Sequence, residues 1–188
     1  MKLTLKSVRL AFPKLFVAES VNGGAPTFGA AFLLDPKHPQ LEEIRNAMDE
    51  VGKAKWGVKW TQIKSGLTAQ DKLALHDGNI KADLDGYAGN FYLNANNKTR
   101  VTVVDRDRTP LVQADGKPYG GCYVNASIEL WAQDNAQHGK RINASLRGVQ
   151  FVKDGEAFAG GGIANEDEFD DLDVGATGED LSADPAFA

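Results

Sequence analysis

One segment, residues 119–132, alternates apolar and polar side chains so regularly that it predicts a β-strand. Val124, Ala126, Ile128 and Leu130 fall on one face of such a strand, and Tyr123, Asn125, Ser127, Glu129 and Trp131 fall on the other. The period is two because successive side chains of a strand point to opposite faces. The 20 glycines of the chain also favour turns and short strands over long helices. We therefore expect a mainly β fold.

Shorter segments with similar patterns predict the other strands. Residues 3–12 alternate loosely and are expected to end at Pro13, and residues 28–34 form the second strand of a plausible hairpin with them. Residues 90–95 and 100–104 flank a turn and predict another hairpin. Residues 141–152 predict a last strand or pair, interrupted at Gly148. Residues 56–75 show no clear period, and residues 75–78 are expected to form a turn.

One amphipathic helix is predicted from residue 41 to about residue 55. Its apolar residues recur at spacings of three and four, namely Leu41, Ile44, Ala47, Met48 and Val51. About seven short strands with one inserted helix favour a small β-barrel of the oligonucleotide-binding (OB) type. A β-sandwich remains open, because the number of strands does not separate the two architectures.

The formal net charge of −5 hides an uneven distribution along the chain. Residues 164–188 hold nine of the 26 acidic residues and no Lys or Arg, which leaves 17 acids against 21 bases, a net charge of +4, in residues 1–163. A basic body points to a polyanionic partner. The acidic segment has too few apolar residues to fold alone, so we expect one domain over residues 1–160 and a disordered acidic tail over residues 161–188.

Nothing in the sequence predicts catalysis. His38, His76 and His138 are far apart and lack a metal-ligand spacing, and no phosphate-binding loop is present. Asp105 and Asp107 resemble a carboxylate pair, but they alternate with arginines in a predicted turn, which favours a solvated charged loop over a metal-dependent nuclease. The single cysteine, Cys122, predicts a buried side chain rather than a disulfide or a nucleophile. We expect no cofactor, no metal and no enzymatic activity.

The sequence also predicts no membrane association. The amino-terminal residues lack the apolar run of a signal peptide, and no segment approaches the roughly 20 apolar residues of a membrane span. The expected location is the cytoplasm.

Aromatic and basic side chains are expected to share one surface of the sheet. A single nucleic-acid strand is held by cations that contact phosphates and by rings on which bases stack. Ring and cation candidates occur together on the outward faces of the predicted strands and in the adjoining turns. They are Tyr87, Tyr92, Lys98, Arg100, Arg106, Arg108, Lys117, Tyr119, Tyr123 and Trp131. The alternative is that one or two of these rings cover a second small core under the helix.

Four stretches of the chain resemble the single-stranded DNA-binding proteins of tailed phages and prophages. They are residues 8–13 (VRLAFP) with Leu15 and Phe16, residues 92–95 (YLNA) with 103–107 (VVDRD), residues 120–127 (GGCYVNAS), and residues 146–156 (LRGVQFVKDGE). The stretches occur in the family's order and cover nearly the whole chain.

The resemblance implies an OB-fold that binds single-stranded DNA without sequence specificity during phage replication and recombination in a bacterial host. It also implies that the acidic tail docks replication proteins such as a polymerase or a primase-helicase. The candidate docking residues are Glu166, Asp167, Glu168, Phe169, Asp170, Asp171, Asp173 and Phe187. Bacterial single-strand binders end in Pro-Phe, whereas here Ala186 separates Pro185 from Phe187 and Ala188 follows. A non-enzymatic phage structural or regulatory protein whose tail mimics DNA is the alternative function.

Overall fold

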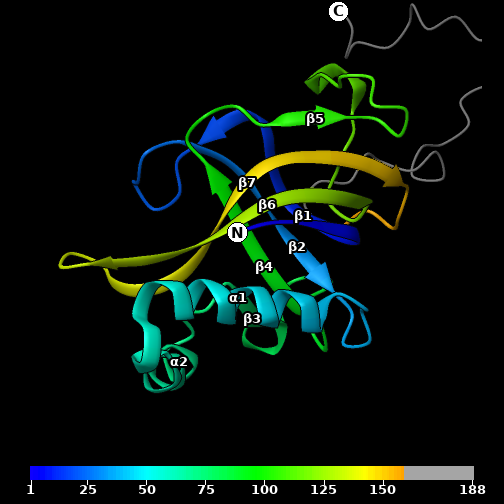
Figure 1. The fold of residues 1–188 in the computed structure, drawn as a ribbon. Coiled ribbons are helices and arrows are strands. Elements are labelled where there is room, and N and C mark those ends of the chain that lie inside the picture. The colour runs from blue at the N-terminus through cyan, green and yellow to red at the C-terminus, as the bar shows by residue number, and fades with distance from the viewer. Residues whose placement is uncertain (159–188) are drawn as a thin grey trace, which may run out of the picture.

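Seven strands and two helices build the part of the chain that the structure, a computed structural model, describes: residues 1–158 (Figure 1). The strands are β1 (Lys2–Glu19), β2 (Thr27–Leu34), β3 (Leu75–Asp77), β4 (Phe91–Asn97), β5 (Thr102–Val104), β6 (Tyr123–Asn135) and β7 (Gly139–Lys153). The helices are α1 (Leu41–Trp56) and α2 (Trp60–Ala69), joined by a 3-10 turn at Gly57–Lys59.

The sheet closes on itself to form a barrel. Its strand order is β3-β4-β2-β1-β6-β7-β5, and β4 also pairs with β7, in parallel, through Asn96 and Ser145. This pairing joins the two ends of the five strands β4, β2, β1, β6 and β7. The predicted OB-type barrel is therefore confirmed, and the sandwich alternative is wrong, because closure removes the free edges that a sandwich keeps.

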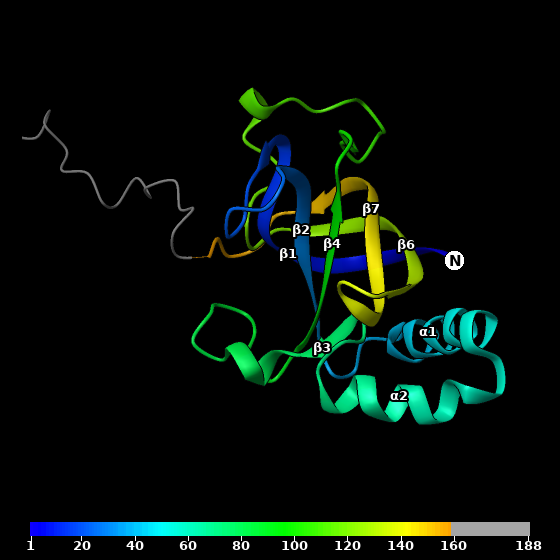
Figure 2. The same ribbon diagram turned by 90° about the vertical axis from the view of Figure 1, so that its left-hand side faces the viewer.

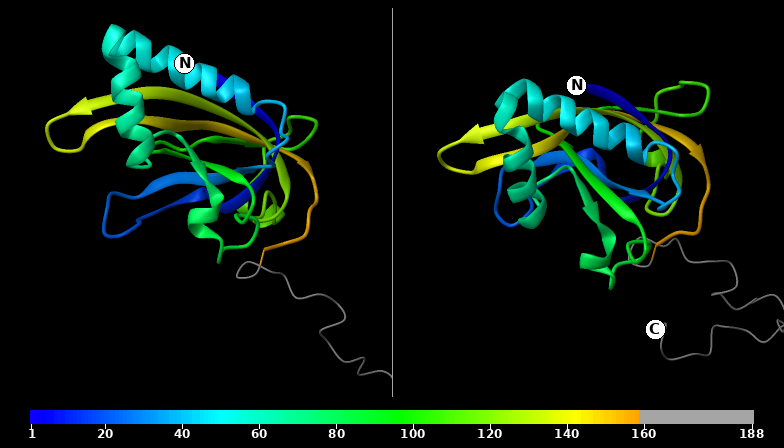
Figure 3. Two further views of the ribbon diagram at one scale, coloured as in Figure 1. Left: turned by 90° about the horizontal axis from the view of Figure 1, so that it is seen from below. Right: turned by 60° about the horizontal axis from the view of Figure 1, so that its bottom comes forward.

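The predicted inward face of β6 lies at the centre of the core. Val124, Ala126, Ile128 and Leu130 are all fully buried, together with apolar residues from the facing strands such as Phe32. The helical segment lies at one end of the barrel (Figure 2), where Ile44 and Met48 of α1 join the same core. The β6–β7 hairpin extends beyond the barrel beside this segment (Figure 3), and Trp56 Nε1 donates to Asp134 Oδ2 at 2.7 Å between them.

The first strand is longer than the sequence pattern indicates. We expected it to end at Pro13, but β1 continues to Glu19. Its second half, from Arg9 to Glu19, pairs with β2, which confirms the hairpin, and its first half pairs with β6. The register shifts between Ala11 and Lys14, and Phe12 adopts a positive φ of 47°. Pro13 is accommodated in this bulge, one of the few strand positions where proline's missing N–H is tolerated.

The hairpin predicted over residues 90–104 is wrong. Strand β4 runs antiparallel to β2 and β3, whereas β5 pairs in parallel with β7 at Thr102–Val104. Asn97 directs the separation, because its side-chain amide donates to the carbonyl of Leu146 at 2.8 Å and its Oδ1 accepts from Thr99 N at 3.0 Å. The chain thus continues in parallel along the same edge of β7 that β4 touches, instead of returning along β4.

Two more elements occupy segments that we expected to be irregular. Helix α2 lies within residues 56–75, and Trp60 at its start is buried and donates through Nε1 to Asp49 at 2.9 Å. Strand β3 replaces the turn expected at residues 75–78 and pairs with β4. Within residues 1–158, neither helix is long and apolar enough to span a membrane.

Candidate nucleic-acid interface

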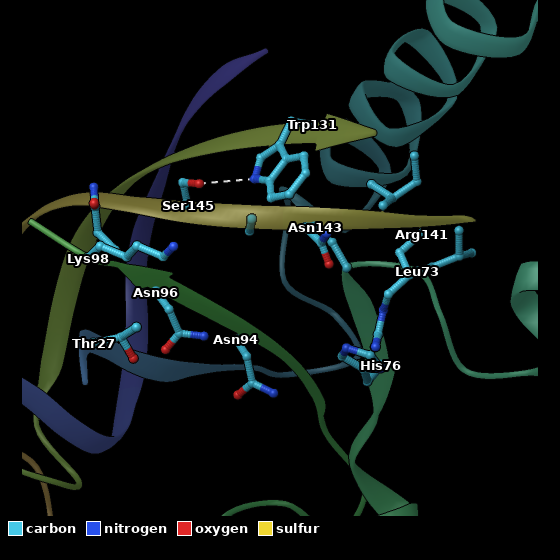
Figure 4. Close-up of a pocket in the computed structure, with 14 residues that line it drawn as sticks. Thr27, Leu73, His76, Asn94, Asn96, Lys98, Trp131, Arg141, Asn143 and Ser145 are labelled. Carbon is cyan, nitrogen blue, oxygen red and sulfur yellow. Dashed lines mark hydrogen bonds between the residues drawn. The ribbon is translucent and has the colours of Figure 1, made fainter. Parts of the chain in front are cut away.

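A groove of about 600 Å³ opens on the outside of the barrel where β4 and β7 diverge from their closing contact (Figure 4). Asn94 and Asn96 of β4 form one wall, and Asn143 and Ser145 of β7 form the other. The segment before β3 contacts β7 here, where the N–H of Ile142 donates to the carbonyl of Lys72 at 3.1 Å. The other residues that line the groove are Thr27, Leu73, Ala74, His76, Asn97, Lys98, Trp131, Arg141, Ile142 and Ala144. We call this the first groove.

Trp131 supplies the aromatic surface of the first groove. It lies on the outward face of β6, directly opposite Asn143 of β7, and 42% of its surface is exposed. Its Nε1 donates to Ser145 Oγ at 3.0 Å, which fixes the ring against β7 (Figure 4). A ring held in this way loses little freedom when a planar ligand stacks on it.

The charged groups that line the first groove are all basic. Lys98 and Arg141 line it, and no Asp or Glu is among its lining residues. The Nε atom of Arg141 is buried and has no hydrogen-bond partner within residues 1–158. Leaving such a donor unpaired costs about 1–3 kcal/mol in the free protein. The arrangement suits phosphate oxygens beside a stacked ring.

His76 forms the end of the groove nearest β3. Its Nδ1 lies 2.7 Å from Asp71 Oδ1, and its ring stacks on Tyr92 with centroids 4.8 Å apart. These two contacts fix the imidazole between the groove and a small apolar cluster behind it.

Two of the predicted interface tyrosines lie in that cluster and not on the surface. Tyr87 and Tyr92 are 1% and 3% exposed, and they pack with Ala11, Ala31 and Leu33 on the outer face of the sheet. Burial raises the pKa of Tyr87 to about 12. The expected exposure of both rings was therefore wrong. The two rings belong to a second small core, but it lies under residues 84–87, which fold back over the outer face of β4, and not under the predicted helix.

The other predicted residues divide into three groups. Trp131 and Lys98 line the first groove. Lys117, Tyr119 and Tyr123 already have partners: Lys117 pairs with Asp105 at 2.8 Å, Tyr119 donates to Asp154 at 2.8 Å, and the Lys153 ammonium lies over the Tyr123 ring at 4.7 Å. Arg100, Arg106 and Arg108 are exposed and lie outside the first groove.

Several groove residues were missed in the sequence. Arg141, Asn143 and Ser145 alternate along β7, and Asn94 and Asn96 alternate along β4, so strand parity places each set on one face. That signal was readable, but polar amides lack the distinctive chemistry of rings and cations. His76 gave no signal, because the strand that holds it is only three residues long.

Asp105 and Asp107, the two carboxylates considered as a nuclease pair, stabilise a turn. Asp105 accepts from the backbone N–H of Arg106 at 2.8 Å and pairs with Lys117, and Asp107 accepts from the N–H of Thr109 at 2.9 Å. The hydrogen bond from Lys117 lowers the pKa of Asp105, and the one from Thr109 lowers that of Asp107. No group of three or more potential metal ligands occurs in the described part of the chain. Burial raises the pKa of the Cys122 thiol to about 11, so this residue is not a nucleophile.

The described chain ends beside the apolar cluster. Phe158 packs against it beneath the Arg9 guanidinium, which lies 4.3 Å from the ring centroid and donates to the carbonyl of Glu156 at 2.7 Å. The predicted acidic tail, residues 161–188, and all of its candidate docking residues lie outside the described residues.

A closed five-stranded barrel with a basic groove and an exposed ring on its outer face defines the oligonucleotide-binding class of β proteins. Within it, the chain belongs to the family of the Enterobacter phage Enc34 ssDNA-binding protein, whose sequence profile matches residues 1–181. The resemblance seen in the sequence is thereby confirmed.

Individual relatives agree with this assignment. Protein p50 of Acyrthosiphon pisum secondary endosymbiont phage 1 is 48% identical over 187 residues, 97% of this chain and all of that protein. The bacteriophage Enc34 single-stranded DNA-binding protein, solved in complex with ssDNA, superposes with a TM-score of 0.72 at 26% identity over 84% of this chain and 89% of its own. Gp2.5 of bacteriophage T7 shares the fold, with a TM-score of 0.56 at 10% identity over 87% of this chain and 98% of its own.

Proposed function

We propose that this protein binds single-stranded DNA without sequence specificity, as a non-enzymatic component of phage DNA replication or recombination. The first groove is the observation that carries the proposal. It places the exposed ring of Trp131 between Lys98 and Arg141 (Figure 4), without a carboxylate among its lining residues. Bases stack on the ring, phosphates accept from the two cations, and the amides of the walls contact base edges or sugars.

The lack of sequence specificity follows from the kind of contacts available. A ring stacks on any base, and a cation meets the same phosphate at every position. The asparagine side chains both donate and accept hydrogen bonds, so they adapt to different base edges. Duplex DNA keeps its bases stacked inside the helix and offers none of them to Trp131.

A direct binding measurement tests the proposal. Fluorescence anisotropy is followed for labelled single-stranded DNA, for the matching duplex and for RNA of the same sequence, over a range of salt concentrations. We expect single strands to bind more tightly than the duplex, with a log–log salt slope near −0.7 for each neutralised phosphate. No cleavage should accompany binding in Mg²⁺. Absence of single-strand binding at low salt would leave the protein-binding, DNA-mimic function as the better description.

We further propose that the acidic segment, residues 164–188, competes with DNA for the groove and docks replication proteins once DNA displaces it. Phe158 is anchored in the cluster that contains Tyr92, and Tyr92 precedes the groove residue Asn94 by two positions on β4, about 7 Å. The eight residues from Phe158 to Glu166 reach at most about 28 Å. A tethered polyanion in this place acts at a local concentration on the order of millimolar.

A further inference from the structure

A second groove continues the first along β7. It has a volume of about 370 Å³ and lies on the outer face of the barrel between β6 and β5. Its lining residues are Thr4, Thr102, Val104, Asn125, Ser127, Arg147, Gly148, Val149 and Gln150. The first groove takes residues 141–145 of β7 and the second takes residues 147–150, so the two follow one another along a single strand.

The same outward face of β6 contributes to both grooves. Trp131 lies in the first groove, and Ser127 and Asn125 lie in the second. Glu129 lies between them on that face, and Lys2 of β1 pairs directly across from it. From Arg141 to Gln150 the path along β7 measures about 30 Å. This is the length of about nine nucleotides at the roughly 3.4 Å spacing of a stacked strand, and one OB-fold binds roughly 4–16 nucleotides.

A β-bulge places Arg147 at the junction of the grooves. Ile128 of β6 pairs with Leu146 and Ser127 pairs with Gly148, which leaves Arg147 as the extra residue of β7. A bulge redirects the side chain of its extra residue, and this one is exposed toward Glu129, with Nη1 3.1 Å from Oε2. Both side chains are about two-fifths exposed, so the ion pair is worth little and exchanges readily for another anion.

The far end of the second groove reaches two of the predicted DNA-binding arginines. Gln150, which lines the groove, donates through Nε2 to the backbone carbonyl of Arg106 at 3.2 Å and so ties the turn at residues 105–109 to β7. Arg106 and Arg108 are exposed on this turn and form no ion pair within the described residues.

We propose that one DNA strand follows β7 through both grooves, from Arg141 past Trp131 to the Arg106–Arg108 turn, and that a phosphate replaces Glu129 as the partner of Arg147. The inference rests on the proposed function and assigns the second groove to the same ligand, single-stranded DNA. Glu129 holds Arg147 in place in the free protein, and its carboxylate is the group that the passing backbone must displace at the junction of the grooves.

Oligonucleotide length separates the two grooves experimentally. An oligothymidylate of about four nucleotides fills the first groove, and one of about twelve fills both. The affinities of both oligomers are measured for the full-length protein, for Arg147→Ala and Glu129→Gln, and for Lys59→Ala, which removes an exposed charge in the turn between α1 and α2. Circular dichroism and the melting temperature verify that each variant is folded.

Arg147→Ala should weaken binding of the long oligomer about tenfold, as expected for one lost charge-assisted hydrogen bond, and leave the short one within about twofold. Glu129→Gln should tighten the long oligomer several-fold, because it removes the competing acceptor, and Lys59→Ala should change neither affinity. If the short oligomer binds but neither variant alters the dependence on length, the second groove is not part of the path. If neither oligomer binds, the proposed function itself fails, and this inference fails with it.

Discussion

Trp131 is the one exposed tryptophan of the three in the chain. Trp60 is buried, and Trp56 stacks on Trp60 and is partly covered. Replacing it with Ala should weaken single-strand binding by roughly 1–3 kcal/mol, the usual worth of one base stacked on a ring. Trp131→Phe should keep much of the affinity, and Trp56→Phe should keep all of it. The measurement is DNA anisotropy at fixed salt. Unchanged binding by a folded Trp131→Ala variant would remove the ring from the interface.

Arg141 is expected to favour binding at the expense of stability. Its buried, unpaired Nε destabilises the free protein. Arg141→Met keeps the aliphatic stem and removes the donor, so the free energy of unfolding should rise by about 1 kcal/mol while DNA affinity falls for every base sequence alike. The salt slope should flatten by about 0.7. Urea unfolding and salt-titrated anisotropy measure the two effects, and a loss of stability would show that the guanidinium is well accommodated without DNA.

Gly52 of α1 and Gly66 of α2 give a matched test of how α1 packs on α2. A Cβ at Gly52 would lie 2.4 Å from the buried Trp60 ring, whereas a Cβ at Gly66 would meet nothing within 4 Å. Alanine is the better helix former by about 1 kcal/mol at both sites. Overpacking outweighs that gain at the first site, so Gly52→Ala should destabilise by about 1–3 kcal/mol and Gly66→Ala should stabilise by up to about 1 kcal/mol. Equal effects in thermal unfolding would contradict the packing against Trp60.

Helices and strands whose apolar residues recur with a strong period were predictable from the sequence. Those that depend on contacts with residues distant in the sequence were not. Strand β6 and helix α1 bury one face each, so their residues carry the period in the sequence. Strand β3 is three residues long, too short to show any alternation, and exists because β4 supplies its hydrogen bonds. Strand β5 lies within the predicted strand 100–104, but its pairing with the distant β7 was not predictable. Helix α2 depends on Trp60, whose burial between the helices gives no local signal.

The same limit applies to the candidate site. The sequence singled out Trp131 and Lys98, which line the groove, because a ring and a cation have distinctive chemistry. Trp131 lies on the regular strand β6, and Lys98 directly follows β4. The sequence misplaced Tyr92. Strand parity assigned its side chain to the correct face of β4, but parity does not show that residues 84–87 cover that face. The predicted outward rings of Tyr119 and Tyr123 meet Asp154 and Lys153, contacts that depend on where β7 ends. Parity assigns a face, whereas only tertiary structure shows whether that face is open.

At the scale of the whole molecule, the opposite charges of the body and the carboxy-terminal segment should regulate binding. The nine acids of residues 164–188 are attached to a body of net charge +4, and the described chain ends beside the cluster that borders the first groove. A tethered polyanion needs no strong contact of its own to compete for the groove. Replacing the nine acids with their amides should therefore tighten single-strand binding at low salt, where attraction between the segment and the groove is least screened.

Salt and chain length distinguish this competition from a general change of net charge. The gain should shrink as ionic strength approaches about 1 M, where the screening length falls to about 3 Å. Deleting residues 164–188 should give a similar gain, because charge and not a specific contact carries the effect. The Trp131→Ala variant should lose affinity by the same factor with either form of the segment. Equal affinities of the acidic and amide forms at low salt would contradict the competition and leave partner docking or solubility as the role of these residues.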